Sequence, residues 1–334
     1  MSAVAAPTTA IHNSGSKRAK RWMGVIANYG TLIAMALMLL IFGITVPDGN
    51  FFNVDNLLNI LDQSALTAII AAGLTIVLVV GEFDLSVGYV ASLAGVLVTG
   101  LISRQNMSIV AAIVVTLAVG VLFGLVNGLI VTKARVNAVV ATLGVGTVVV
   151  GLSYGYTSGS PIVEVPDAFI ELTIGKTLHL SNSIWFMALV LLVLWVLLNR
   201  TPLGYRIQAV GGNLHAARLA GIRTDRIKIA AFAIAGLCAA FTGILLSSLL
   251  GSGTVSAADA YLMDSFAAVF LGSATLRDGE FHILGTLIGV LVVNVGFNGL
   301  SQLGTPVFWQ FIFKGGILVM AVALSTMARR YAKS

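Results

Sequence analysis

Long apolar runs separated by short polar segments dominate the chain. An α-helix rises about 1.5 Å per residue, so roughly 20 apolar residues cross the ~30 Å hydrocarbon core of a bilayer. On this basis the sequence predicts ten membrane-spanning helices, at 24–46, 64–80, 85–103, 107–132, 138–157, 184–199, 227–250, 265–276, 281–303 and 306–327. The spans at 64–80, 184–199 and 265–276 are short, and whether they cross fully stays open.

Composition agrees with this pattern. Of the 334 residues, 58% are hydrophobic and 10% are charged, whereas soluble domains carry roughly a quarter charged residues. We therefore expect an all-α polytopic membrane protein with a disordered basic cytoplasmic tail at 1–23, a transmembrane domain at 24–327 and a cytoplasmic tail at 328–334. The single cysteine, Cys238, lies in an apolar run and excludes a disulfide within the chain.

Basic residues predict the orientation. If ten spans alternate, all of the 19 lysines and arginines except Arg104, Lys176 and Lys314 fall in cytoplasmic segments. Cytoplasmic loops are enriched in lysine and arginine, so both termini are expected in the cytoplasm. The basic residues are spread over several loops rather than one soluble face, which argues against a nucleic-acid partner.

Two spans share a short pattern. Phe123–Leu129 in the fourth span and Gly296–Leu300 in the ninth each contain an Asn-Gly-Leu sequence, with Asn127 and Asn298 in equivalent places. The two spans run in opposite directions, which is typical of an inverted repeat relating spans 2–5 to spans 7–10. Coincidence explains so short a match equally well.

Glycines at intervals of four residues predict close helix packing. Gly120, Gly124 and Gly128 share one helix face, and so do Gly151 and Gly155. Lipid provides no hydrophobic drive between helices, so small residues allow the backbones to approach. Packing within the chain is favoured over a subunit interface.

Motifs of enzymes appear in unsuitable places. Gly151-Leu-Ser153-Tyr-Gly155 matches a nucleophile elbow by letter, but it lies inside an apolar helix without histidine or acid partners. Gly175-Lys176-Thr177 lacks the first glycine of a phosphate-binding loop. We expect neither an enzyme nor a metal or cofactor site in this chain.

The segment 200–228 is the longest predicted cytoplasmic loop. Asn213 is a favourable N-cap for a short helix over Leu214–Leu219, and Gly221 is a favourable residue just after its end. Such a helix can insert into a groove on a partner protein or lie on lipid headgroups. The residues alone leave both possibilities open.

Three stretches carry a resemblance to a known family. Ala209–Gly221, Gly81–Gly88 and Gly285–Gly289 resemble permease subunits of ABC importers for ribose, xylose, arabinose and similar monosaccharides, within the branched-chain amino acid/monosaccharide permease superfamily. The similarity covers about residues 51–324. The turn at Leu271–His282 departs from the family pattern, because it has fewer glycines and more charges than the same turn in many members. The cytoplasmic contact that this turn makes in the family is therefore not carried over to this chain.

The resemblance implies a bacterial cytoplasmic-membrane permease that pairs with a second copy of itself. A separate cytoplasmic ATPase would bind ATP and Mg²⁺, an extracytoplasmic binding protein would deliver sugar, and this chain would bind no cofactor. The same analogy assigns ATPase coupling to Gly211, Gly212, Asn213, Ala216, Ala217, Arg218 and Gly221. The alternatives are an ion-coupled secondary transporter and an ABC permease for branched-chain amino acids.

Four polar residues within or beside spans are candidates for the transport pathway or for structural roles: Asp84, Asn127, Asn298 and Lys314. Asp84 is placed to cap a helix that begins at Leu85, which is favoured over substrate contact. Lys314 suits a structural ion pair and a pathway role equally. The two asparagines suit sugar contact and helix-bridging hydrogen bonds equally.

Overall fold

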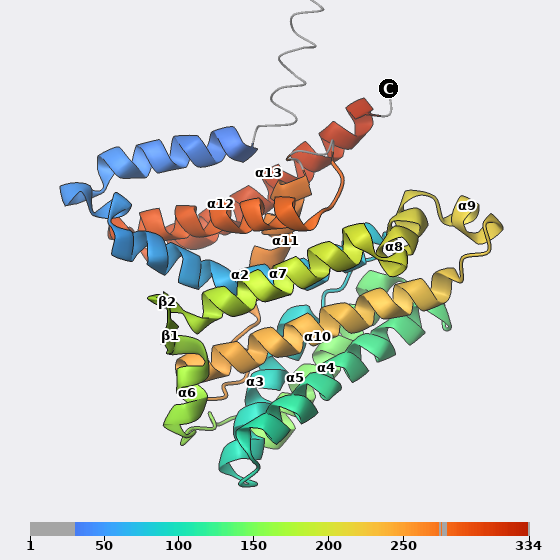
Figure 1. Cartoon of the computed structure of the whole chain (residues 1–334), viewed down its shortest axis with the longest axis horizontal. Helices are drawn as coiled ribbons and strands as arrows, with labels where there is room; N and C mark the ends of the chain where they lie inside the picture. The colour runs from blue at the N-terminus through green and yellow to red at the C-terminus, as the bar shows by residue number, and fades with distance from the viewer. Residues whose placement is uncertain (1–30, 274, 276–278, 333–334) are drawn as a thin grey trace, which may run out of the picture.

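The computed structural model describes residues 31–273, 275 and 279–332, without the side chains of residue 48 and residues 324–332. Its long helices run side by side in roughly one direction (Figure 1). In chain order the elements are a first helix Thr31–Thr45, η1 (Pro47–Phe52), α2 (Val54–Val79), α3 (Val87–Ser103), α4 (Ile109–Thr132), α5 (Ala138–Thr157), α6 (Asp167–Ile174), β1 (Lys176–Thr177), β2 (Leu180–Ser181), α7 (Asn182–Arg200), α8 (Pro202–Gly212), α9 (Leu214–Leu219), α10 (Thr224–Leu250), α11 (Ala260–Ser273), α12 (Ile283–Gln302) and α13 (Val307–Ala332).

Most of these helices are apolar enough to lie in a membrane. In the described part of the chain, six helices have both the length and the composition needed to cross a bilayer: α2, α4, α5, α7, α10 and α12. Four shorter apolar helices accompany them, namely the first helix, α3, α11 and the portion of α13 up to Ala323. The expected helical, multi-pass membrane fold is therefore confirmed.

The three weak spans differ from the sequence prediction in their bounds. The predicted span 64–80 is the end of α2, which begins at Val54 because Asn53 caps it and its first turns carry polar side chains. The predicted span 184–199 is α7, a helix of 19 residues. The predicted span 265–276 is α11, whose 14 residues extend only about 21 Å, less than the hydrocarbon thickness.

The centre of the molecule is built on α2 and α10. Residues 64–78 of α2 are all buried, and α2 packs against α7, α10, α11 and α12. Helix α10 packs in addition against α3 and α4. A helix that is buried on every side needs no polar face, which explains the continuous apolar sequence of α2 after Ser64.

The glycine pattern is confirmed in one helix and wrong in another. A Cβ atom at Gly120, Gly124 or Gly128 of α4 would overlap the backbone or the side chains of α10, so these glycines permit close packing within the chain. Gly151 and Gly155 of α5 have no atom within 4 Å of such a Cβ in the described structure. Their face of α5 is open.

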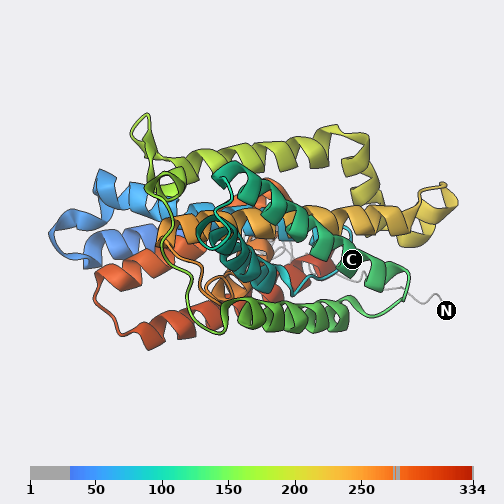
Figure 2. The same cartoon turned by 90° about the horizontal axis from the view of Figure 1, so that it is seen from below.

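One end of the molecule carries a small hairpin. Strands β1 and β2 pair antiparallel, and this hairpin lies at the end opposite to α8 and α9 (Figures 1 and 2). The neighbouring helix α6 is fixed to α10, because the hydroxyl of Ser248 donates to the carbonyl of Phe169 at 2.6 Å and the hydroxyl of Thr173 donates to the carbonyl of Leu245 at 3.1 Å. Within the segment 158–183, helix α6 is thus held against α10, whereas β1 and the hairpin turn are exposed.

Helix α13 continues to Ala332, past the end of the predicted last span at 327. Residues 328–332 of the expected cytoplasmic tail are therefore helical, and their side of the membrane stays a prediction. The predicted tail 1–23, the first residues of the first span, and residues 274, 276–278 and 333–334 lie outside the described residues. These include Arg277 and Asp278 of the turn that departs from the family pattern.

Candidate functional site

The short helix α9 lies where the sequence predicts it. The side chain of Asn213 accepts a hydrogen bond from the backbone N–H of Ala216 at 3.0 Å, and Gly221 has a φ of +78° just beyond the helix. Within this helix Ala217 is buried, whereas Leu219 is 91% exposed. Helix α9 therefore projects as a capped unit at one end of the molecule (Figure 1).

The preceding segment is helical, which the sequence analysis missed. Helix α8 begins after Thr201, whose side chain caps it, with Pro202 in the first turn. A Cβ atom at Gly211 would overlap the carbonyl of Val79 at the end of α2, whereas one at Gly212 would meet nothing within 4 Å. The two adjacent glycines therefore serve different purposes, one in packing within the chain and one at an open surface.

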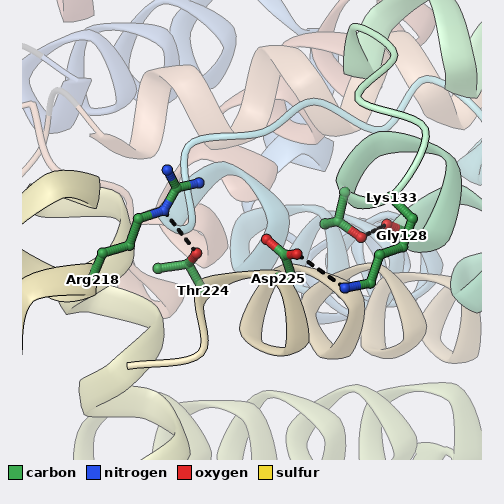
Figure 3. A network of polar contacts seen from close by, with 6 residues as sticks. Gly128, Lys133, Arg218, Thr224 and Asp225 are labelled. Atoms are coloured by element: carbon green, nitrogen blue, oxygen red, sulfur yellow. Dashed lines mark hydrogen bonds and ion pairs between the residues drawn. The ribbon is translucent and has the colours of Figure 1, made fainter. Parts of the chain in front are cut away.

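Polar contacts attach this region to the transmembrane helices. The guanidinium of Arg218 in α9 donates to the hydroxyl of Thr224 at 3.3 Å, at the start of α10. The next residue, Asp225, pairs with Lys133 beyond α4 at 3.1 Å (Figure 3). These contacts connect α9 through the start of α10 to the end of α4.

The predicted coupling residues are mostly exposed. Of the seven, all except Ala217 are exposed: Gly211, Gly212, Asn213, Ala216, Arg218 and Gly221. Small side chains and exposed backbone predominate among these residues. Such an exposed segment suits contact with another protein or with a membrane surface.

Asp84 and Asn127 belong to a buried network near the same end. The carboxylate of Asp84 accepts hydrogen bonds from the backbone N–H of Ser86 at 2.9 Å and from its hydroxyl at 2.6 Å. The amide of Asn127 donates to that hydroxyl at 2.7 Å. The predicted cap for a helix from Leu85 is wrong in position, because α3 begins at Val87 and Ser86 is its N-cap residue.

Asp84 lies between α2 and α3, outside both helices. Burial raises the pKa of its carboxyl from 3.8 to about 6, although the two hydrogen bonds from Ser86 lower it. The role that the structure shows for Asp84 is to order the turn before α3.

Asn298 and Lys314 lie in a second polar cluster. The amide of Asn298 donates to the side chain of Asn56 at 2.9 Å. The ammonium of Lys314 pairs with Asp264 of α11 at 2.8 Å and lies 4.5 Å from the centre of the Phe297 ring. Of the two roles considered for Lys314, the ion pair is confirmed.

A pocket of about 400 Å³ adjoins this cluster, between α2, α12 and α13. Its lining is mainly amide and hydroxyl side chains, with one aromatic ring and one ammonium group: Asn59, Gln63, Phe297, Asn298, Ser301, Gln302, Gln310 and Lys314. A second hollow of about 230 Å³ lies at the hairpin and shares Asn59 with the pocket.

The sequence analysis missed two members of this cluster. Asp264 was overlooked because the predicted span began one residue later, at 265, although an acid next to an apolar run is a recognisable signal. Asn56 was overlooked because the residues before 64 were assigned to a loop. An earlier start for each helix would have placed both residues within the membrane region.

Comparisons with known proteins agree on one family. Residues 56–322 match the family described as "Branched-chain amino acid transport system / permease component". The chain is 38% identical over 292 residues to the ribose import permease protein of Escherichia coli (strain K12), covering 86% of this chain and 91% of that protein. It is 33% identical to the galactose/methyl galactoside import permease protein of Haemophilus influenzae, covering 90% and 94% of the two chains.

A third relative, the L-arabinose ABC transporter permease protein of Azospirillum brasilense, is 32% identical and covers 91% of this chain and 89% of its own length. No solved structure matches this chain. The family match covers well over half of the chain, and the relatives match along most of theirs. The chain belongs to the branched-chain amino acid transport system permease family and, within it, resembles the permeases of sugar ABC importers.

Proposed function

We propose that this chain is the transmembrane permease subunit of an ATP-binding-cassette importer that takes up a monosaccharide. A soluble binding protein delivers the sugar, and a separate ATPase subunit supplies the energy. The names of the relatives, for ribose, galactose and arabinose, support the substrate class. The single observation that carries the coupling role is α9, a capped helix that projects from the molecule and exposes Leu219.

In this proposal ATP and Mg²⁺ bind to the ATPase, and this chain binds no cofactor. The ATPase docks against the exposed surface of α8 and α9 and moves these helices when it closes. Because Arg218 and Asp225 connect α9 to α10 and to Lys133, the movement reaches the transmembrane helices directly. The bundle then alternates between outward-open and inward-open states.

We further propose ten membrane crossings in a bacterial cytoplasmic membrane, with both termini in the cytoplasm. Six long and four shorter apolar helices support this number. The distribution of basic residues supports the orientation, because cytoplasmic segments are enriched in lysine and arginine. The segment that contains α8 and α9 and its flanks carries Arg200, Arg206, Arg223 and Arg226. The hairpin then faces outward, where a binding protein arrives.

The packing of helices supports an inverted repeat of α2–α5 and α10–α13. Helix α10 packs on α3 and α4, and helix α2 packs on the equivalent pair, α11 and α12. In the same way α3 contacts α5, and α11 contacts α13. Each helix of one half thus has contacts that match those of the equivalent helix in the other half, as an inverted repeat requires.

The open face of α5 supports a second copy of the chain as a partner. Gly151 and Gly155 lie one helical turn apart with no atom of the described chain near them, and small residues of this kind permit close helix association in a membrane. The rest of the exposed helix surface contacts lipid.

Two alternatives make different predictions. An ion-coupled secondary transporter would take up substrate without any ATPase subunit. A permease for branched-chain amino acids is suggested by the description of the family, and it would move leucine or valine rather than sugar. Uptake by vesicles that contain the complete complex, with ribose and leucine compared, separates all three.

Co-purification with the neighbouring ATPase subunit tests the coupling surface. A Cβ atom at Gly212 meets nothing within 4 Å in the described chain, so Gly212→Trp should abolish ATPase association and ATP-driven uptake without unfolding the permease. Leu178→Trp in the hairpin turn, where Leu178 is 77% exposed, is the matched control and should keep the ATPase bound. Normal association of the Gly212→Trp variant would exclude α8 and α9 as the docking surface.

A further inference from the structure

The pocket between α2, α12 and α13 shares no residue with the proposed ATPase-docking surface on α8 and α9. We propose that it is a transit site for a neutral polyhydroxylated molecule, in which a sugar pauses during transport. This inference rests on the proposed function and adds the location and the chemistry of the site.

The lining of the pocket matches the surface of a sugar. Six of its side chains are neutral hydrogen-bonding groups: Asn59, Gln63, Asn298, Ser301, Gln302 and Gln310. Amides donate and accept, and hydroxyls do both, so such a lining pairs with ligand hydroxyl groups in many orientations. Phe297 adds an apolar surface for the C–H face of a sugar ring.

The charge of Lys314 in the pocket wall is compensated by Asp264 behind it. Lys314 is paired with Asp264 at 2.8 Å, and the two side chains are 25% and 12% exposed. A partly buried cation without its partner would attract an anion, but this pair leaves little net charge for a ligand. The pocket therefore favours a neutral solute over a sugar phosphate or a carboxylate.

Asn298 has unused hydrogen-bonding capacity. Its side-chain nitrogen donates to Asn56, but its side-chain oxygen is buried and has no hydrogen-bond partner among the described residues. A buried acceptor without a donor is unfavourable by roughly 1–3 kcal/mol. Because Asn298 lines the pocket, the hydroxyl of a bound ligand is the donor that we assign to this oxygen.

The size and position of the pocket suit passage of a small solute. Its volume of about 400 Å³ falls within the range of about 300–1,000 Å³ typical of small-molecule sites. Asn59 lines both this pocket and the hollow at the hairpin, so the two hollows adjoin. This places the pocket next to the hollow at the hairpin, on the proposed route of an arriving solute.

Two residues of α13 show that this face does not contact lipid. Gln310 and Lys314 are four positions apart and hence on one side of the helix, and both line the pocket. Polar groups that face hydrocarbon are costly, so a polar face within an apolar helix lines a water-filled path or contacts protein. Phe311, which is 70% exposed, marks a different, apolar face of the same helix.

Filling the pocket is the first test. In vesicles that contain the full importer complex, Gln310→Trp and Ser301→Trp should each lower D-ribose uptake about tenfold or more, because a bulky side chain occupies the path. ATPase association should stay normal, since both residues line the pocket that adjoins the hairpin hollow, and the hairpin lies at the end opposite to α9. Phe311→Trp adds bulk one residue away, outside the pocket, and should transport like the wild type.

The second test measures whether a cysteine introduced into the pocket can be reached by a thiol reagent. It changes the side chain less than the tryptophan substitutions do. The wild-type chain has one cysteine, Cys238, which is buried, so it provides an unreactive background. Gln310→Cys should react with a membrane-impermeant thiol reagent added from outside, and D-ribose with its loaded binding protein should slow that reaction. D-Ribose 5-phosphate should give no protection.

The outcomes separate this inference from the proposed function. Failure of the wild-type complex to take up any sugar in an ATP-dependent way would refute the proposed function itself. Normal wild-type uptake together with normal uptake by both tryptophan variants would refute the transit site alone. An unreactive Gln310→Cys thiol in an active transporter would have the same meaning, because a transit site must be reached by water.

Discussion

The projection formed by α8 and α9 and the pocket between α2, α12 and α13 are stabilised by different kinds of contacts. In the projection the hydrogen bonds are local: the Asn213 cap joins residues three apart, and the bond from Arg218 to Thr224 joins residues six apart. At the pocket, the bond between Asn298 and Asn56 joins residues 242 apart.

This difference matters for transport. Helix α9 is ordered by its own cap, so it can keep its shape when a partner moves it. A pocket ordered by contacts between distant helices changes when those helices move relative to one another. A movement of α9 that shifts α2, α12 or α13 relative to one another would change the pocket, while the shape of α9 stays constant.

The largest expected effect concerns the ion pair at the pocket. Lys314→Met leaves the carboxylate of Asp264 partly buried without its partner, and breaking such a pair typically lowers the free energy of unfolding by about 3–5 kcal/mol. We expect a clearly lower thermal unfolding temperature for the detergent-solubilised variant. The double variant Lys314→Met/Asp264→Leu removes both charges and should recover most of the stability; equal stability of the single variant and the wild type would contradict a structural ion pair.

A smaller effect is expected where α8 contacts α2. Gly211→Leu forces a side chain against the carbonyl of Val79, and overpacking of this kind costs about 1–3 kcal/mol. Gly212→Leu is the matched control, because the adjacent position is open, and its unfolding temperature should equal that of the wild type. Similar losses in both variants would show that α8 does not pack on α2 in this way.

The smallest effect concerns the cap of α9. Asn213→Ala removes the side chain that accepts the N–H of Ala216, at a cost of about 1 kcal/mol confined to this helix. Hydrogen exchange of residues 214–219 should be faster in the variant, while the global unfolding temperature stays the same. Asn213→Asp keeps an acceptor and should exchange like the wild type; unchanged exchange in the alanine variant would mean that the cap does not order α9.

Features that depend on neighbouring residues were the ones that the sequence predicted well. Helix α9 has the expected bounds because Asn213 and Gly221 act on backbone groups within a few residues of themselves. Helix α8 was missed because Gly204, Gly211 and Gly212 are weak helix formers, and only packing on α2 and α7 explains why two of them are glycines.

The pocket could not be predicted in the same way. Asn298 and Lys314 were candidates from the sequence, but their partners, Asn56 and Asp264, lie on other helices. Nothing in an apolar sequence specifies which helix is the neighbour of which, because many arrangements bury similar surfaces in a membrane. The same reason explains the open face at Gly151 and Gly155, where packing within the chain was expected.

The amino-acid sequence by itself determined that the chain is a helical membrane protein, that a short capped helix spans Leu214–Leu219, and which family it resembles. These depend on apolar run length, on local capping and on short motifs. Only the tertiary structure decided that Gly211 packs on α2 while Gly212 remains open, that Lys314 pairs with Asp264, and that polar residues of α2, α12 and α13 surround one pocket. Such relations join residues that are distant in the sequence, so they arise only when the helices pack together.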